Sequence, residues 1–361
     1  MLHLWKRRLF TPSAPSTKTA PLAVTTGFGG RRTSGSGRTS VIQYLPPAAQ
    51  RVRLTIRNWN PRYVFADQRA VALTEVKIGR HTGDGRGTGW VELQAGATAY
   101  DSGWTDVPAS LRGAEIVLQY RWEGRDVVRC LGTGWTDGVR DPFPPLFSWL
   151  EVEVPTSTPV VAVFGSSTAA GVGAERPIID SWFGLWAREH GVVPMFVAHS
   201  GDKALAWSSV SDRKWSLYGD EAVPVDAVLY AMGSNDWAER VSLAVLQHRV
   251  ETTIGGIRVR TDAPIFGTTI TPRRRRPPNE QTRIAYNEWL QESGLFAGVI
   301  DLAAAVSLPD GTLDPAVDHD GTHVNPLGHA RLAAAVPPSV MHAVASRCCR
   351  RGRRRLFPHP R

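Results

Sequence analysis

The sequence predicts an α/β fold in two parts: a three-layer α/β/α domain built on a parallel sheet, preceded by an antiparallel β-sandwich of jelly-roll type. Two observations predict this division. Before Pro155, short runs of alternating apolar and polar residues are separated by Gly, Asp and Pro turns, and they show no helical period. After Pro155, apolar strand-like runs alternate with amphipathic helical patterns, which is typical of a parallel sheet covered by helices on both faces.

Composition and charge distribution limit the functional classes. The chain has 361 residues, of which 42% are hydrophobic and 21% charged, a composition typical of folded domains. Residues 1–40 and 347–361 together hold fourteen Lys and Arg and no acid, so the net charge of +9 comes from the ends and the rest carries −5. The basic tails could contact an anionic surface, but no basic helix or aromatic-interleaved module accompanies them. We therefore expect no specific nucleic-acid partner.

The sequence indicates neither a disulfide framework nor a metal site. Cys130, Cys348 and Cys349 have neither scaffold nor zinc spacing, and no His and carboxylate cluster has metal-ligand spacing. We therefore expect no cofactor and no metal. No apolar run is long enough to span a bilayer, and residues 1–24 lack the uninterrupted apolar run of a signal peptide, which leaves the compartment undecided.

Composition shifts predict the boundaries of the two domains. Residues 1–45 are rich in Ser, Thr, Gly, Pro and Arg without periodicity, so we expect a disordered basic leader. The α/β domain is expected over residues 156–345, and a basic tail over 346–361. The sandwich is expected over residues 46–155, with strands in VRLTIRNW, AVALTEVKIG, GWVELQAG, AEIVLQYRW and WLEVEV.

The sandwich segment is rich in tryptophan. A flat indole ring can stack on the apolar face of a sugar ring, so exposed tryptophans could form a glycan-binding platform. The alternative, which we expect for most of them, is a position in the core or at the domain interface. The residues are Trp59, Trp90, Trp104, Trp122, Trp135 and Trp149.

The α/β segment contains five candidate strands. Helices are expected between them in IDSWFGLWAREH, VSLAVLQHRVETTI and TRIAYNEWLQES. The last helix has a clear start, because Asn325 can cap it and Pro326 suits its first turn. The strands are expected at Val160 to Phe164, Met195 to Ala198, Ala227 to Met232, Pro264 to Ile270 and Gly298 to Leu302.

Polar residues follow four of these strands, at the sheet edge where α/β proteins bind ligands. GSS follows the first strand, SGD the second and GSND the third, and the fifth leads through a loop to DHDGTHVNPLGH. A serine hydroxyl such as that of Ser167 is a poor nucleophile unless a base takes its proton. His323 can do this if Asp320, three residues earlier, holds its other ring nitrogen. The resulting oxyanion needs donors, which the N–H of Gly201, the Asn235 amide and the Ser167 N–H would supply.

The four blocks resemble the SGNH family of esterases, also called GDSL-like hydrolases, over about residues 158–340. The resemblance implies ester hydrolysis through an acyl-enzyme, and it is compatible with an extracellular or cell-surface location. It makes Ser167 the nucleophile and Asp320 and His323 the rest of the catalytic triad. It makes Gly201 and Asn235, with the Ser167 N–H, the oxyanion hole.

Two positions depart from the family pattern. Ser166 stands where the first block most often has Asp, which alters the support of the nucleophile but leaves its position intact. The Asn that often precedes the second block is absent, because the sequence there is FVAHSGD. His319 competes with His323 as the base, but only His323 has the right offset from Asp320, and His199 is expected to shape the pocket.

The run Arg273 to Arg276, in PRRRRPP, follows the fourth strand and could reach the same sheet edge. If it is ordered there, it would select an anionic polymer or lipid head group; a proline-flanked charge run is more often a solvated loop. Two other motif classes fit worse. GSSTA lacks the second glycine of the ordinary α/β-hydrolase elbow, and no Gly-rich turn ends in Gly-Lys-Ser or Gly-Lys-Thr.

The sequence therefore predicts a serine esterase that deacetylates a carbohydrate or acts on a lipid or a small ester. The carbohydrate is preferred because a sandwich before such a domain resembles the arrangement of carbohydrate esterases. Acyl transfer to another hydroxyl would use the same residues. The alternative is a catalytically inactive glycan-binding or structural module of a cell wall or virion, but the intact constellation favours the enzyme.

Overall fold

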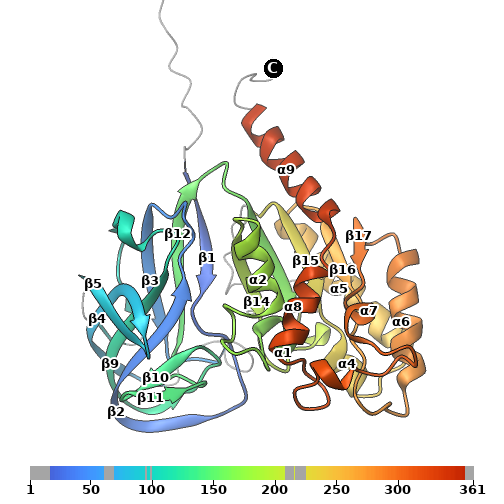
Figure 1. Cartoon of the computed structure of the whole chain (residues 1–361), viewed down its shortest axis with the longest axis horizontal. Coiled ribbons are helices and arrows are strands. Elements are labelled where there is room, and N and C mark those ends of the chain that lie inside the picture. The colour runs from blue at the N-terminus through green and yellow to red at the C-terminus, as the bar shows by residue number, and fades with distance from the viewer. Residues whose placement is uncertain are drawn as a thin grey trace, which may run out of the picture.

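The computed structural model of the chain describes residues 17–60, 69–93, 96–97, 100–207, 215 and 225–353. The start of the expected leader and the end of the expected basic tail lie outside these residues. Figure 1 shows a β-rich N-terminal part packed against a part in which helices flank a third sheet. Within the described ranges, no helix combines the length and the apolar character that crossing a membrane requires.

Two antiparallel sheets form the N-terminal sandwich and share one buried core. Across the smaller sheet lie β1 (Thr17–Ala23), β12 (Phe147–Pro155), β3 (Arg51–Arg57) and β7 (Tyr100–Asp101), with β8 (Thr105–Asp106) also paired to β3. Across the larger sheet lie β11 (Val139–Asp141), β10 (Gly134–Thr136), β2 (Arg32–Tyr44), β9 (Glu115–Val128), β4 (Val71–Gly83) and β5 (Arg86–Glu92), with β6 (Gly96–Ala97) also paired to β4. A short 3₁₀ helix, η1 (Ala109–Leu111), precedes β9.

The expectation of a disordered leader is wrong for most of residues 17–44, because β1 and β2 lie there. β1 alternates buried Ala20 and Leu22 with half-buried neighbours at the edge of the smaller sheet. β2 lies inside the larger sheet, and its Ser, Thr and Gly residues are mainly exposed at its start, whereas Val41 and Ile42 are buried near its end. Low apolar content was misleading because backbone pairing needs no particular side chain, and partner strands supply much of the buried surface. The sandwich therefore includes strands from Thr17 onward.

The third sheet is parallel and confirms the predicted α/β/α class. Across it lie β14 (Val193–Ala198), β13 (Val160–Gly165), β15 (Ala227–Ala231), β16 (Ile265–Thr268) and β17 (Gly298–Ile300), close to the five predicted strands. β13 is buried on both sides, as a continuous apolar run predicts. Its Phe164 packs in the core with one helical layer, and its Val163 packs with the other.

Helices cover both faces of the parallel sheet (Figure 1). One layer contains α5 (Leu243–Arg260) and α6 (Glu280–Glu292). The other contains α1 (Ser167–Ala170), α2 (Trp182–Glu189), α7 (Leu302–Val306), α8 (Pro326–Ala334) and α9 (Pro338–Arg353). The shorter elements are α4 (Ser234–Ala238), η2 (Ala204–Trp207) and η3 (Pro315–Val317).

The ends of the last two helices test two expectations. The predicted start of α8 is confirmed, because the Asn325 side chain accepts from the Gly328 N–H at 3.0 Å and Pro326 is the first helical residue. The expected start of the basic tail at residue 346 is wrong, because α9 continues to Arg353. Its buried Val340 and Val344 attach the helix to the core.

The sandwich and the α/β domain share a buried interface. β1 runs beside β14, the edge strand of the parallel sheet. Lys18 of β1 reaches Asp226, the residue before β15, with Nζ 3.0 Å from Oδ2 and side chains only 5% and 0% exposed. The same oxygen accepts from the Val160 N–H at 3.0 Å, so one buried carboxylate ties both domains together. Elsewhere Trp135 of the sandwich forms a buried cluster with Ile179.

Candidate active site

The structure brings Ser167, His323 and Asp320 into hydrogen-bond contact. Ser167 begins α1 directly after β13, and the other two lie in the loop before α8. His323 Nε2 is 2.8 Å from Ser167 Oγ, and His323 Nδ1 is 2.8 Å from Asp320 Oδ2. This is the geometry in which an imidazole can take a hydroxyl proton while a carboxylate orients the ring.

Hydrogen bonds hold Asp320 in its ionised form. Its Oδ1 accepts from the backbone N–H groups of Thr322 at 3.0 Å and His323 at 2.8 Å. Burial raises the pKa of this carboxyl, but hydrogen bonds from the backbone and side chain of His323 outweigh burial and lower the pKa to about 2. A carboxylate that is ionised at neutral pH favours the ring tautomer with a proton on Nδ1. His323 Nε2 is then free to accept the hydroxyl proton.

The arginine run is ordered against the loop that carries the triad. The Arg274 N–H donates to Gly321 O at 3.1 Å, and the Arg274 guanidinium lies 3.3 Å from Asp318. The Arg273 guanidinium lies 4.9 Å from the Trp237 ring centroid. Burial lowers the pKa of Arg273, and the charge of Asp320 opposes this shift. The run therefore lies at the sheet edge of the triad, while Arg275 and Arg276 remain exposed.

Gly201 and Asn235 lie on turns that meet at the same sheet edge. Gly201 follows β14 with φ of +81°, a conformation that residues with a Cβ rarely adopt. Asn235 lies in the first turn of α4, and its Nδ2 donates to Asp202 O at 2.8 Å. This bond holds the Asn235 amide against the turn that contains Gly201, as an oxyanion-binding pair would require.

Asp236, for which the sequence predicted no role, has a fully buried carboxylate. It accepts from the N–H groups of Ala204 at 2.8 Å and Leu205 at 3.3 Å, and Arg249 Nη1 lies 2.9 Å from its Oδ1. Asp236 thus ties α4 and α5 to the turn that follows Gly201. The sequence did contain a signal for this role. Asp236 ends the GSND block after a buried strand, and a carboxylate that is buried there needs a charged or hydrogen-bonding partner.

The sandwich also holds the turn after β14. The Gly27 N–H, in the loop between β1 and β2, donates to His199 Nδ1 at 3.1 Å, and Gly27 O accepts from the Ser200 N–H at 2.8 Å. His199 and Ser200 directly precede Gly201. His199 is buried and supports this turn, which is consistent with the expectation that it is not the base. No local pattern predicts this contact, since Gly27 and His199 are 172 residues apart.

The alternative nucleophile Ser166 and the alternative base His319 are not part of the hydrogen-bonded contact between Ser167, His323 and Asp320. Ser166 is 4% exposed and lines a small pocket of about 30 Å³. The His319 N–H donates to His323 O at 2.9 Å, so His319 supports the loop through its backbone. Among the residues that the structure describes, no group of three or more His, Cys, Asp and Glu is placed to hold a metal ion.

The family model of GDSL-like lipases and acylhydrolases matches residues 163–331. The α/β domain belongs to this family. The protein is therefore a carboxylic ester hydrolase of the GDSL type, and the matched range contains Ser167, Gly201, Asn235, Asp320 and His323. No sequence of a curated protein matches the chain.

Solved structures resemble either the GDSL domain or most of the chain. A member of the lipolytic G-D-S-L family from Veillonella parvula is 14% identical, and the match covers 49% of this chain and 94% of that chain with a TM-score of 0.41. A family two carbohydrate esterase from Clostridium thermocellum, in complex with cellohexaose, is 12% identical over 89% of this chain and 98% of that chain (TM-score 0.44). A carbohydrate esterase family 2 enzyme with a carbohydrate binding domain, from Corynascus thermopiles (Myceliophthora fergusii), is 16% identical over 91% and 99% of the two chains (TM-score 0.43).

A second histidine of the GDSL domain, His329 in α8, is buried in the neutral form. Its Nδ1 accepts from the Trp182 N–H at 3.2 Å, so its Nε2–H donates to Val172 O at 3.1 Å. Burial lowers the pKa of His329 to about 4. A protonated ring would lose the acceptor that Trp182 requires and would place a charge in the core.

This environment predicts that acid destabilises the GDSL domain. In the unfolded chain the imidazole binds a proton near pH 6.5, whereas in the folded chain it does so near pH 4. The free energy of unfolding should therefore fall by up to about 3 kcal/mol between these pH values, and this group should contribute no pH dependence above them. Urea unfolding from pH 8 to pH 4 measures the slope. In His329→Gln, which cannot titrate, the slope should be smaller; an identical slope would contradict the assignment.

Proposed function

We propose that the enzyme attacks its ester with Ser167 and proceeds through an acyl-enzyme. The Ser167–His323–Asp320 contact is the observation that supports this mechanism. His323 Nε2 takes the proton of Ser167 Oγ as that oxygen bonds to the ester carbonyl carbon, and Asp320 stabilises the imidazolium. The N–H groups of Ser167 and Gly201 and the Asn235 amide bind the oxyanion of the tetrahedral intermediate.

The reaction is then completed in two stages, formation of the acyl-enzyme and its hydrolysis. The bond from carbon to the alcohol oxygen breaks, the imidazolium of His323 protonates that oxygen, and the acyl group remains on Ser167 Oγ. A water molecule next gives a proton to His323 and attacks the acyl carbon, which releases the carboxylic acid and restores the hydroxyl. A sugar hydroxyl in place of water would give acyl transfer, which product analysis with an added sugar acceptor would detect.

The proposed substrate is an O-acetylated glycan. The rim of the triad is polar: the Asp320 side chain is 45% exposed, and Arg274 and Asp318 form an ion pair beside it. Such a rim suits a short acyl group on a polar alcohol, whereas a long alkyl chain needs contiguous apolar surface. Lipids and small esters are the alternatives that the experiment separates.

The test is hydrolysis of p-nitrophenyl acetate, butyrate and octanoate, together with release of acetate from acetylated xylan. We expect acetate to be preferred among the three esters and acetate to be released from the polymer. A preference for octanoate would overturn the glycan proposal in favour of a lipid. No hydrolysis of any substrate would favour the inactive-module alternative.

The Asn235 amide gives a separate prediction. Asn235→Ala should lower kcat for p-nitrophenyl acetate by about 10²–10³-fold with a small change in KM, because the oxyanion develops only after attack. Asn279→Ala is the matched control, since it removes an amide that donates to Trp237 O at the far end of α4. Equal kcat values for the two variants would remove Asn235 from the oxyanion hole.

A further inference from the structure

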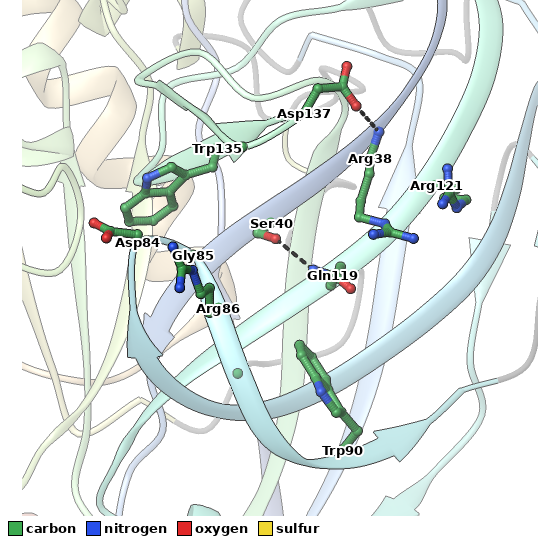
Figure 2. Close-up of a pocket in the computed structure, with 12 residues that line it drawn as sticks. Arg38, Ser40, Asp84, Gly85, Arg86, Trp90, Gln119, Arg121, Trp135 and Asp137 are labelled. Atoms are coloured by element: carbon green, nitrogen blue, oxygen red, sulfur yellow. Dashed lines mark hydrogen bonds between the residues drawn. The ribbon is translucent and has the colours of Figure 1, made fainter.

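A groove of about 720 Å³ lies on the outer face of the larger sandwich sheet (Figure 2). Its floor contains Ser40 of β2 and Gln119 of β9, whose amide donates to the Ser40 hydroxyl at 3.0 Å. Their neighbours Val41 and Leu118 are buried in the sandwich core, so the floor residues point away from that core. The groove therefore presents uncharged hydrogen-bonding groups on a rigid sheet.

Two tryptophans line the groove, and glycines make room for both. The rings of Trp90 and Trp135 lie beside the floor in Figure 2. A Cβ at Gly79 or at Gly87 would approach Trp90 ring atoms to 2.8 Å, and a Cβ at Gly85 would approach the Trp135 ring equally closely. The Trp90 ring thus lies directly against strand backbone, and the Trp135 ring lies against the turn between β4 and β5.

Cations already contact both rings. Lys77 Nζ lies 4.6 Å from the Trp90 ring centroid, and Arg140 Cζ lies 4.8 Å from that of Trp135. A π face that attracts a cation also attracts the weakly positive C–H groups of a sugar ring. A bound sugar would share these faces with the cations or displace the flexible Lys77 side chain.

The rim of the groove carries charges of both signs. Arg38 and Arg121 lie at one end in Figure 2, and both guanidinium groups contact Glu75, at 3.1 Å and 2.8 Å. Asp84 and Arg86 lie at the other end. The lining holds three arginines and two aspartates, and this mixture offers both donors and acceptors to hydroxyl groups.

We propose that this groove binds a segment of a polysaccharide, with a sugar ring stacked on Trp90 and hydroxyl groups bonded to Gln119, Asp84 and Arg86. A sugar ring is apolar on its face and hydroxylated at its edge, and the groove pairs aromatic walls with a polar floor and rim. The choice of a saccharide rests in part on the proposed glycan substrate, so this inference deepens the proposed function.

The groove borders the loop that leaves the nucleophile helix. Arg140 donates to Glu175 O at 3.0 Å, and Trp135 shares a buried cluster with Ile179. Both contacts attach the groove wall to residues between α1 and α2. In Figure 1, β10 and β11 lie at the same end of the molecule as α1.

The same loop reaches the triad at its other end. Gly173 packs so closely on the residue after His323 that a Cβ there would lie 2.2 Å from Val324 O and 3.2 Å from the His319 Cβ. The groove and the loop that carries Asp320 and His323 therefore contact the segment between α1 and α2 from two sides. A polysaccharide held by Trp90 would extend towards Ser167, and the groove would raise the local concentration of esters near the triad.

Affinity gel electrophoresis of the full-length Ser167→Ala protein tests this proposal without turnover. The probes are soluble xylan, glucomannan, hydroxyethylcellulose and polygalacturonate, each cast in a native gel. We expect at least one neutral polysaccharide to slow migration. Trp90→Ala and Gln119→Ala in the same background should each weaken binding at least tenfold, and Trp90→Phe should restore most of it, because the stacking face is kept.

Trp104→Ala is the matched control, because Trp104 is another half-buried sandwich tryptophan, flanked by Arg51 and Arg53 and not part of the groove lining. It should bind as tightly as the parent protein. Circular dichroism and thermal melting show whether each variant is folded. No retardation by any polymer, or retardation that survives Trp90→Ala in the folded protein, would overturn the groove. Binding without hydrolysis by the wild type would instead overturn the proposed function, and hydrolysis without binding would overturn only the groove.

Discussion

Replacing Ser167 by alanine is expected to lower kcat for p-nitrophenyl acetate by about 10⁴–10⁶-fold. The variant keeps the oxyanion donors and the His323–Asp320 contact, but it has no hydroxyl from which His323 can take a proton. Any residual hydrolysis would come from water acting in a preorganised site. Stopped assays with purified protein, compared with the uncatalysed rate, measure the loss.

Ser166→Ala is the matched control for this result. Both serines are buried and adjacent, but only Ser167 contacts His323. Ser166→Ala should retain most of the activity, and both variants should melt near the wild-type temperature. Activity that persists in Ser167→Ala and disappears in Ser166→Ala would show that the nucleophile lies one residue earlier.

The second large effect is expected at the domain interface. Asp226→Ala removes the carboxylate that the buried Lys18 ammonium contacts at 3.0 Å, and it also removes the acceptor of the Val160 N–H. Breaking a buried ion pair from one side typically costs about 3–5 kcal/mol. We expect a loss of this size in the free energy of unfolding, measured by urea denaturation followed by tryptophan fluorescence.

A surface ion pair of the sandwich is the control for that measurement. Arg51 and Asp106 are 3.6 Å apart, but their side chains are 41% and 92% exposed. Asp106→Ala should therefore cost less than about 1 kcal/mol. If Asp226→Ala costs no more than Asp106→Ala, the buried pair is not what holds the two domains together.

The α/β domain was predictable because its signals are local. Buried parallel strands are continuous apolar runs, so all five were recognised, and their carboxyl ends had to share one edge. Asp320 and His323 are three residues apart, so their contact could be inferred from one turn. Ser167 lies 156 residues from His323, and the shared edge of the parallel strands together with the family resemblance predicted their contact.

The position of β2 and the environments of the tryptophans depend on tertiary contacts, which leave no local pattern in the sequence. β2 did not look like a strand because its polar residues face a groove and solvent, and its partners β9 and β10 come from much later in the chain. The tryptophans were equally ambiguous. Trp122 is buried in the core as expected, whereas Trp90 lines the groove, and no local pattern in the sequence distinguishes the two environments.

The bonds between Gly27 and the turn after β14 also constrain how the enzyme matures. Contacts between residues far apart in sequence form late, because long loops must close first, and an N-terminal segment emerges from the ribosome before its distant partners exist. The contact of Gly27 with His199 cannot form before His199 is synthesised, and the contact of Ser167 with His323 cannot form before His323 is synthesised. A nascent chain can therefore complete most of its sandwich before the turn at Gly201 and the loop at His323 have formed. We therefore expect the contact between Ser167 and His323 to form in a late step of folding.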